Sequence, residues 1–237
     1  MGELLSMVEV TGHRGAAGLE PENTLRSFRR AVELGVDAVE LDVHLSLDDE
    51  LIVMHDARVD RTTNGKGWVR DLRSEQIRRL DAGLGEHVPI LQEVIDLVLG
   101  KAAIQIELKG KGTEAPTVRL IEANRCEAQV RLTSFDHRRV KSVKALNPSI
   151  RTGVLFACRP IDPVRLAKDA DADALHIHHA MVDQELVAAA HAAGLRVAVW
   201  NIDDPDEAEA AAALGVDAVG TNRPDIVTER LRRKRYR

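Results

Sequence analysis

Acidic residues recur two positions apart in strand-like segments of this chain. Glu40 and Asp42 lie in the apolar run 38–45, and Glu107 ends a similar run that begins at Ala103. Because alternate residues of a strand share a face, Glu40 and Asp42 are expected to point to the same side. Burying three unpaired carboxylates would cost several kcal/mol each, so a cation is expected among them.

A divalent metal ion is the cation that this set of oxygen ligands suits best. We predict Mg²⁺ or Ca²⁺, and not zinc, held by Glu40, Asp42 and Glu107 and completed by water or a substrate oxygen. The alternative is that Glu40 and Asp42 form ordinary ion pairs with Arg14 and Lys109. Lys109 alone cannot balance three acids, which favours the metal site.

Two histidines follow strand-like segments and could move protons beside these acids. His13 ends the first such segment, and His55 ends a segment that runs back after a turn at Asp48-Asp49. An imidazole titrates near neutrality, so one histidine can accept a proton while the other donates one. Arg14 adds a planar guanidinium that can grip a phosphate through two parallel hydrogen bonds.

A repeated helix-to-strand pattern must position these residues. The hexapeptide Leu-Gly-Val-Asp-Ala-Val occurs at 34–39 and again at 214–219, each time after an Ala-containing helical stretch. Gly35 and Gly215 can adopt the left-handed conformation that ends a helix, and the β-branched residues that follow suit a buried parallel strand. The same pattern predicts eight strands, near residues 8–13, 38–45, 103–108, 130–134, 151–155, 174–178, 196–200 and 217–221.

Eight alternating units in 237 residues favour a (β/α)8 TIM barrel over an open sheet. Such barrels carry their chemistry at the carboxyl ends of the strands, where the residues above lie. A hairpin is predicted after the second strand, with residues 50–54 returning so that Asp42 lies opposite His55. An elaborated loop follows over about 56–101, with a helix near 91–99. We expect one barrel domain over residues 1–229 and a basic tail over 230–237.

Composition excludes several classes of function. Only six of the 237 residues are Phe, Trp or Tyr, so nucleic-acid binding by base stacking is not expected. No run approaches the roughly 18 apolar residues of a membrane span, and the first residues lack an export signal, so we expect a cytoplasmic protein without stable membrane association. Cys126 and Cys158 are far apart and are expected to be two buried, reduced thiols.

The ordered motifs of the chain resemble the glycerophosphodiester phosphodiesterase family. His-Arg-Gly by itself is a weak signal, but the whole ordered set is specific and spans about residues 10–225. The matching segments are His13-Arg14-Gly15, Pro21-Glu22-Asn23-Thr24, Glu40-Leu41-Asp42, His55-Asp56, Arg61-Thr62-Thr63-Asn64-Gly65, Ile106-Glu107-Leu108-Lys109 and Val199-Trp200-Asn201.

This resemblance implies a barrel enzyme that uses a divalent metal ion to hydrolyse glycerophosphodiesters to sn-glycerol 3-phosphate and an alcohol. By matching position, the metal ligands would be Glu40, Asp42 and Glu107, and the acid and base would be His13 and His55. Arg14 and Lys109 would bind the phosphoryl oxygens, and Trp200 would line the glycerol pocket. The nucleophile is either water or the glycerol 2-hydroxyl, and either histidine could be the base.

The chain departs from the family near its last strand, where many relatives have Thr-Asp and this chain has Thr221-Asn222. Asparagine cannot balance a cation's charge, so we leave Asn222 out of the catalytic set. The motif His176-Ile177-His178-His179 is expected to line a pocket or lie in the core. His44 is either a residue of the same cavity or a hydrogen-bonded polar residue.

Two alternative functions are a lysophospholipase D-type phosphodiesterase on the same barrel and a non-catalytic barrel that binds a phosphate ligand. The first would need a lipid-accepting groove, for which the scarce aromatic residues give little support. The second is disfavoured because every expected catalytic position is filled. The expected partners are a small-molecule substrate and, at most, further copies of the chain in a homo-oligomer.

Overall fold

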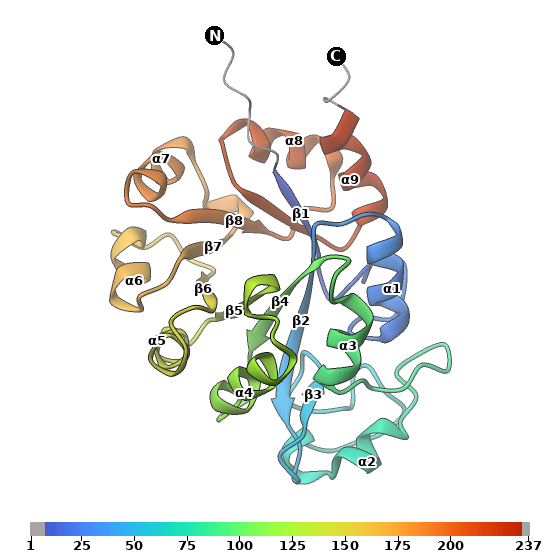
Figure 1. Cartoon of the computed structure of the whole chain (residues 1–237). Helices are drawn as coiled ribbons and strands as arrows, with labels where there is room; N and C mark the ends of the chain where they lie inside the picture. The colour runs from blue at the N-terminus through green and yellow to red at the C-terminus, as the bar shows by residue number, and fades with distance from the viewer. Residues whose placement is uncertain (1–7, 234–237) are drawn as a thin grey trace.

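Eight parallel strands form a closed barrel in the computed structural model, which describes residues 8–233 (Figure 1). The ring closes because β1 pairs with both neighbours, Thr11 lying opposite Ala38 of β2 and Gly220 of β9. This confirms the predicted (β/α)8 barrel. The barrel strands are β1 (Glu9–Gly12), β2 (Ala38–Leu45), β4 (Ala103–Leu108), β5 (Val130–Ser134), β6 (Arg151–Phe156), β7 (Ala174–His178), β8 (Arg196–Trp200) and β9 (Ala218–Thr221).

Helices pack around the outside of this ring (Figure 1). Gly35 and Gly215 have positive φ angles of 75° and 90° and follow helices that end just before them, as predicted. Asp162 and Asp204 cap two helices that each begin with a proline. The surrounding helices are α1 (Leu25–Glu33), α3 (Leu91–Val98), α4 (Glu114–Asn124), α5 (His137–Leu146), α6 (Pro163–Asp169), α7 (Gln184–Ala192), α8 (Pro205–Ala213) and α9 (Pro224–Arg233). Short 3-10 helices are η1 (Val69–Asp71), η2 (Glu127–Gln129) and η3 (His179–Met181).

The aliphatic core lies between the strands and the helices, whereas the inside of the barrel also holds charged and polar side chains. Leu41 and Val43 of β2 are fully buried in the outer core, while Glu40 and Asp42 alternate with them on the inner face. At the amino-terminal end of the barrel, buried Arg131 forms an ion pair with Glu9 and donates a hydrogen bond to Thr11. Charged and polar side chains therefore fill the amino-terminal end of the barrel. The predicted site residues lie toward the carboxyl-terminal end.

The predicted hairpin after β2 is present, but its register differs by one residue. Strand β3 (Leu51–Val53) runs antiparallel to β2 with Val43 opposite Val53, and the Met54 amide donates to the Asp42 carbonyl at 3.0 Å. The turn contains three residues, and Asp49 is left-handed with a φ of 59°. We predicted a two-residue turn with Asp42 opposite His55. The extra turn residue places Met54 there, and His55 follows it.

The chain between the hairpin and α3 forms a small layer of its own, which we call the rim segment (residues 56–90). It contains η1 and α2 (Ser74–Arg78) and lies beside the hairpin (Figure 1). A separate apolar cluster holds it against β3, built from Ile52, Met54, Val59, Val69, Ile77, Ala82 and Val88. The rim segment thus has its own small core next to the mouth of the barrel.

Helix α9 extends into the segment that we expected to be a basic tail. Residues 230–233 continue the helix, and Arg230 forms ion pairs with Asp206 and with Glu209, the latter at 3.6 Å. Arg232 pairs with Asp37 at 3.3 Å. The rest of the predicted tail, residues 234–237, lies outside the described residues.

Two other features of the described chain bear on the expectations from composition. Within residues 8–233, no helix is both long and apolar enough to cross a membrane. Both cysteines are free, as expected, but only Cys126 is buried. Cys158 is exposed, because it follows β6 in a surface loop and not within a strand.

Candidate active site

The three predicted metal ligands meet at the carboxyl ends of β2 and β4. These strands pair in parallel with Asp42 opposite Glu107 and Glu40 opposite Gln105. One oxygen from each of Glu40, Asp42 and Glu107 lies within 4.8 Å of the others, and all three residues are buried. Burial and the neighbouring Asp42 carboxylate raise the pKa values of Glu40 and Glu107, to about 8 and about 7. Ionising all three carboxylates would therefore concentrate negative charge where water cannot screen it.

Arg14 and Lys109 also contact this cluster, so part of the ion-pair alternative holds as well. Lys109 Nζ lies 2.9 Å from Glu107 and 3.6 Å from Asp42, and Arg14 Nε lies 3.5 Å from Asp42. The Arg14 backbone amide donates to Glu40 at 3.0 Å. Two cations do not balance three carboxylates. The all-oxygen donor set and the raised carboxylate pKa values therefore fit a hard divalent cation.

The loop after β1 turns sharply so that His13 and Arg14 both face the cluster. Arg14 has a φ of 48° and Gly15 a φ of 86°, so two successive residues are left-handed. A Cβ on Gly15 would lie 2.5 Å from Ser27 Oγ, which explains why glycine is needed there. Ser27 Oγ in turn accepts from the Ala16 amide and donates to the Arg14 carbonyl, both at 2.8 Å.

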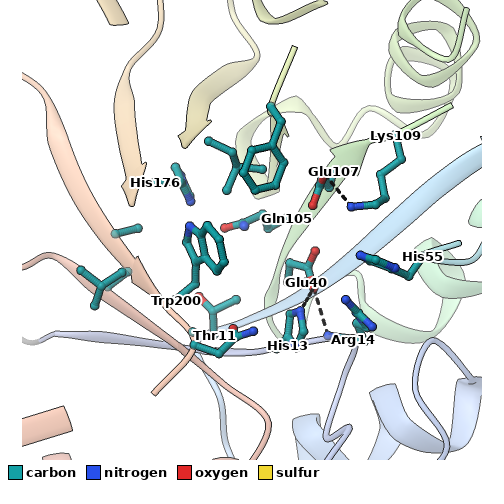
Figure 2. A pocket seen from close by; sticks show the side chains of 17 residues that line it. Thr11, His13, Arg14, Glu40, His55, Gln105, Glu107, Lys109, His176 and Trp200 are labelled. Atoms are coloured by element: carbon teal, nitrogen blue, oxygen red, sulfur yellow. Dashed lines mark hydrogen bonds and ion pairs between the residues drawn. The ribbon is translucent and has the colours of Figure 1, made fainter. Parts of the chain in front are cut away.

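Each histidine of the site is held through its Nδ1 atom. His13 Nδ1 lies 2.6 Å from Asn222 Oδ1, and His55 Nδ1 lies 2.6 Å from Asp56 Oδ1. An amide or carboxylate oxygen can only accept, so Nδ1 carries the proton in both rings. Nε2 is then the atom left for chemistry in each neutral ring. Figure 2 shows the two rings on different sides of Glu40.

Burial lowers the pKa of both histidines, although the contributions from their neighbours differ. For His13, the Arg14 cation lowers the pKa further, and the bond to Asn222 opposes this. For His55, Asp42 and the bond to Asp56 oppose the effect of burial. Both rings are therefore biased toward the neutral form, the form whose Nε2 can accept a proton.

Sequence reasoning missed the supports of both histidines. Asn222, which we left outside the catalytic set, contacts His13 and is itself held by Asp203, with its Nδ2 donating to Asp203 Oδ2 at 2.8 Å. Asp56 was part of a family motif but had no assigned role. The departure at Asn222 marked its position, yet nothing local indicated that it lies beside a residue 209 positions earlier. His44 is the hydrogen-bonded polar residue of the two alternatives, with Nε2 lying 3.0 Å from the His55 carbonyl.

A cavity of about 190 Å³ runs from this cluster into the barrel (Figure 2). Seven of the eight predicted site residues line it, and Asp42 lies behind them with 1% of its surface exposed. The far wall is apolar, and the Phe135 and Trp200 rings meet edge to face at 5.7 Å. Trp200 Nε1 and Asn201 Oδ1 are buried without a hydrogen-bond partner among the described residues. The deeper lining consists of Thr11, Gln105, Leu155, His176, Ala198, Val199, Ala218 and Gly220.

Residues 13–226 match the model of the glycerophosphoryl diester phosphodiesterase family. The chain belongs to this family. It is 35% identical over 237 aligned residues to the glycerophosphodiester phosphodiesterase of Caldanaerobacter subterraneus, covering 94% of this chain and 98% of that one. It is also 34% identical to the glycerophosphodiester phosphodiesterase of Bacillus altitudinis, covering 92% and 96% of the two chains.

Solved structures of the family share the fold. A phosphodiesterase of Oleispira antarctica, solved with the product sn-glycerol-3-phosphate, has a TM-score of 0.87 and 30% identity, covering 95% of this chain and 97% of that one. A structure from Silicibacter pomeroyi has a TM-score of 0.88 and 27% identity, covering 95% and 93%. The resemblance inferred from the motifs is thus confirmed, and the chain is a phosphodiesterase.

Proposed function

We propose that this family member hydrolyses glycerophosphodiesters to sn-glycerol 3-phosphate and an alcohol with the help of one bound Mg²⁺ or Ca²⁺. The observation that carries the proposal is the meeting of three buried carboxylates, two Nδ1-anchored histidines and Arg14 around one cavity. The Oleispira relative supports the choice of product, because it was solved with sn-glycerol-3-phosphate.

Glu40, Asp42 and Glu107 would hold the ion, and Arg14 and Lys109 would bind the phosphoryl oxygens beside it. The ion, when bound, supplies positive charge that polarises a phosphoryl oxygen. Arg14 offers a planar fork of donors, whereas Lys109 offers a point charge held near Glu107. The two side chains approach the cavity from β1 and β4, so they can neutralise different oxygens of one phosphoryl group as charge shifts.

His13 and His55 would carry the protons of an in-line displacement at phosphorus. The Nε2 atom of one neutral ring takes the proton of the attacking hydroxyl, and the other ring, protonated, gives its Nε2 proton to the leaving alkoxide. The two rings lie on different sides of Glu40, so one can serve the attacking group and the other the leaving group (Figure 2). Anchoring at Nδ1 keeps each ring in the orientation that this transfer requires.

The cavity suits a short polyol better than a lipid chain. Its volume of about 190 Å³ lies below the roughly 300 Å³ at which pockets for drug-sized ligands begin. Trp200 lines the cavity and would cover the carbon face of glycerol. These features favour a glycerophosphodiester over a lysophospholipid as substrate.

The test is release of sn-glycerol 3-phosphate from glycerophosphocholine and glycerophosphoethanolamine, first with EDTA and then with Mg²⁺, Ca²⁺ or Mn²⁺ restored singly. We expect no release with EDTA and recovery with a restored divalent ion. Transient glycerol cyclic phosphate would identify the 2-hydroxyl as nucleophile, and its absence during a full time course would identify water. Hydrolysis of lysophosphatidylcholine but of neither glycerophosphodiester would show that the substrate is a lysophospholipid. Binding of glycerol phosphate without turnover of any diester would show a binding protein and not an enzyme.

A further inference from the structure

Arg61, in the rim segment, grips two carboxylates that come from different parts of the chain. Its Nε and Nη2 donate to Asp56 at 2.7 and 3.1 Å, and its Nη1 and Nη2 donate to Glu22 at 2.8 Å each. A guanidinium can do this because its donors lie in one rigid plane. Arg61 thus ties the rim segment to the loop between β1 and α1.

Both carboxylates continue into the proposed active site. Asp56 Oδ1 accepts from His55 Nδ1 at 2.6 Å, and Glu22 Oε1 accepts from Arg14 Nη1 at 2.8 Å. His55 and Arg14 line the cavity, whereas the lining does not include Arg61, Asp56 or Glu22. Arg61 therefore does not line the cavity and reaches it through the side chains that it holds.

We propose that Arg61 is a positioning residue, whose double grip on Asp56 and Glu22 fixes the carboxylate that orients His55. This inference rests on the proposed role of His55 in proton transfer. Asp56 adjoins His55 on an exposed loop, so its carboxylate needs a partner from elsewhere to stay directed at the ring. Glu22 supplies the fixed end, because Arg14 holds it from the barrel side.

The charges of the three groups agree with this arrangement. The bonds from Arg61 are the largest cause of a pKa of Asp56 well below its ordinary value, and His55 adds to the effect. Burial would raise the pKa of Glu22, but Arg61 and Arg14 outweigh it and lower that pKa as well. Both carboxylates remain charged acceptors at neutral pH. Arg61 is half exposed, so solvent screens its attraction and its main contribution is the geometry that it imposes.

His13 is supported in the same way as His55, but by residues outside the rim segment. Its Nδ1 partner, Asn222, is held by Asp203 through a side-chain bond at 2.8 Å and a backbone bond at 2.7 Å. Each histidine thus has a partner that is itself held by another residue, but only the support of His55 depends on residues outside the barrel. Loss of Arg61 should therefore disturb His55 and leave His13 in place.

The decisive experiment compares Arg61→Ala and Arg61→Lys with Arg58→Ala, assayed on glycerophosphocholine with the restored metal ion. Arg58 is a matched control, since it also pairs with an aspartate of the rim segment, Asp60, at 2.8 Å and is similarly exposed. Because a misplacement of about 1 Å can cost about a hundredfold, we expect Arg61→Ala to lower kcat by roughly 10- to 100-fold. KM and the metal concentration for half-activation should stay within about threefold, because neither Arg14 nor the carboxylate cluster loses its remaining contacts.

The kcat of Arg61→Lys should fall less than that of Arg61→Ala, because an ammonium group can still pair with one of the two carboxylates. It should not reach the wild-type kcat, because an ammonium group cannot bind both carboxylates as the guanidinium does. Arg58→Ala should keep the wild-type kcat. Equal losses in Arg58→Ala and Arg61→Ala would show only a loosened rim segment and would overturn the inference. If Arg61→Ala fails to fold, as thermal unfolding would show, an undiminished kcat in Arg61→Lys would overturn it.

A double variant separates this inference from the proposed function. If Arg61 acts through His55, His55→Ala with Arg61→Ala should turn over at the rate of His55→Ala alone, within about threefold. If the losses of kcat in the two single variants multiply in the double variant, Arg61 acts on a group other than His55. A wild-type rate in His55→Ala would instead remove His55 from the proposed mechanism, whereas a low rate there with a normal rate in Arg61→Ala would defeat only the positioning role.

Discussion

Charge balance decides what the cluster of Glu40, Asp42 and Glu107 can do at the residue scale. Arg14 and Lys109 approach it, yet the pKa of Glu40 stands at about 8, because burial and Asp42 outweigh the bonds and charges that lower it. A divalent ion would supply the missing positive charge, and removing one ligand should weaken its binding.

We therefore expect Glu107→Gln to raise the concentration of Mg²⁺ or Ca²⁺ needed for half-maximal activity by roughly tenfold or more, since a neutral amide oxygen replaces a charged one. Metal titration of activity measures this. Glu114→Gln is the control, because Glu114 is a partly buried carboxylate paired with Arg139 at 3.6 Å outside the cluster. An unchanged metal requirement in Glu107→Gln would point to a different ligand set.

The two histidines lead to a second prediction at this scale. His13→Ala and His55→Ala should each lower kcat by at least about a hundredfold with an unchanged unfolding midpoint, the usual contribution of a general acid or base. His87→Ala serves as control, because the His87 side chain pairs only with Glu93 among the described residues and lies away from the cavity. A near-normal rate in either active-site variant would remove that histidine from the mechanism.

At the scale of elements, the loop from β1 to α1 must hold an unusual backbone shape to present His13 and Arg14. Two successive positive φ angles at Arg14 and Gly15 bring the chain back against Ser27 of α1. The site therefore depends on how closely this loop packs on the first helix, and not only on the side chains that it carries.

Gly15→Ala should destabilise the protein by about 2–4 kcal/mol in urea unfolding, because it adds a close contact with Ser27 to the cost of a left-handed alanine. Gly194→Ala separates these two costs, since Gly194 also has a positive φ, 77°, but its Cβ would meet nothing within 4 Å. We expect about 1 kcal/mol for that control. Equal losses in the two variants would mean that the loop tolerates the added methyl group.

At the scale of the whole molecule, the barrel interior combines charged residues at its amino-terminal end with an uncharged histidine, His176. His176 is fully buried beside Gly153, where an added Cβ would lie 2.4 Å from the ring. The pKa of His176 is lowered to about 3, chiefly by burial; Arg131 and Arg196 contribute to the lowering, and Glu9 opposes it. The fold therefore holds this ring in its neutral form.

This predicts a pH dependence of stability. His176 takes up a proton near pH 6.5 in the unfolded chain but only near pH 3 in the folded protein. The stability that the neutral ring contributes is therefore fully present above about pH 6.5 and is lost as the pH falls below it. In EDTA, the free energy of unfolding of the wild type should fall faster than that of His176→Gln, by up to about 1.4 kcal/mol per pH unit. Urea titrations between pH 7 and pH 4.5 measure the difference, and parallel curves would contradict it.

Much of the fold could be predicted because its signals are local. The strand positions follow from the apolar runs. Gly35 and Gly215 each follow the end of a helix, so they indicate where the next strand can begin. The carboxylates could be brought together for the same reason, since strand alternation and the parallel pairing of β2 with β4 place Asp42 beside Glu107.

Only the tertiary structure decided what supports those groups. The hairpin register depended on one left-handed residue, Asp49, which the sequence pattern did not indicate. The contact of His13 with Asn222 exists because β1 pairs with β9 when the barrel closes, and the grip of Arg61 on Glu22 exists because the rim segment folds back over the β1–α1 loop. Side-chain periodicity reports the few residues on either side of a position, whereas these contacts join residues 39 and 209 positions apart and are formed only when the barrel closes and the rim segment packs beside its mouth.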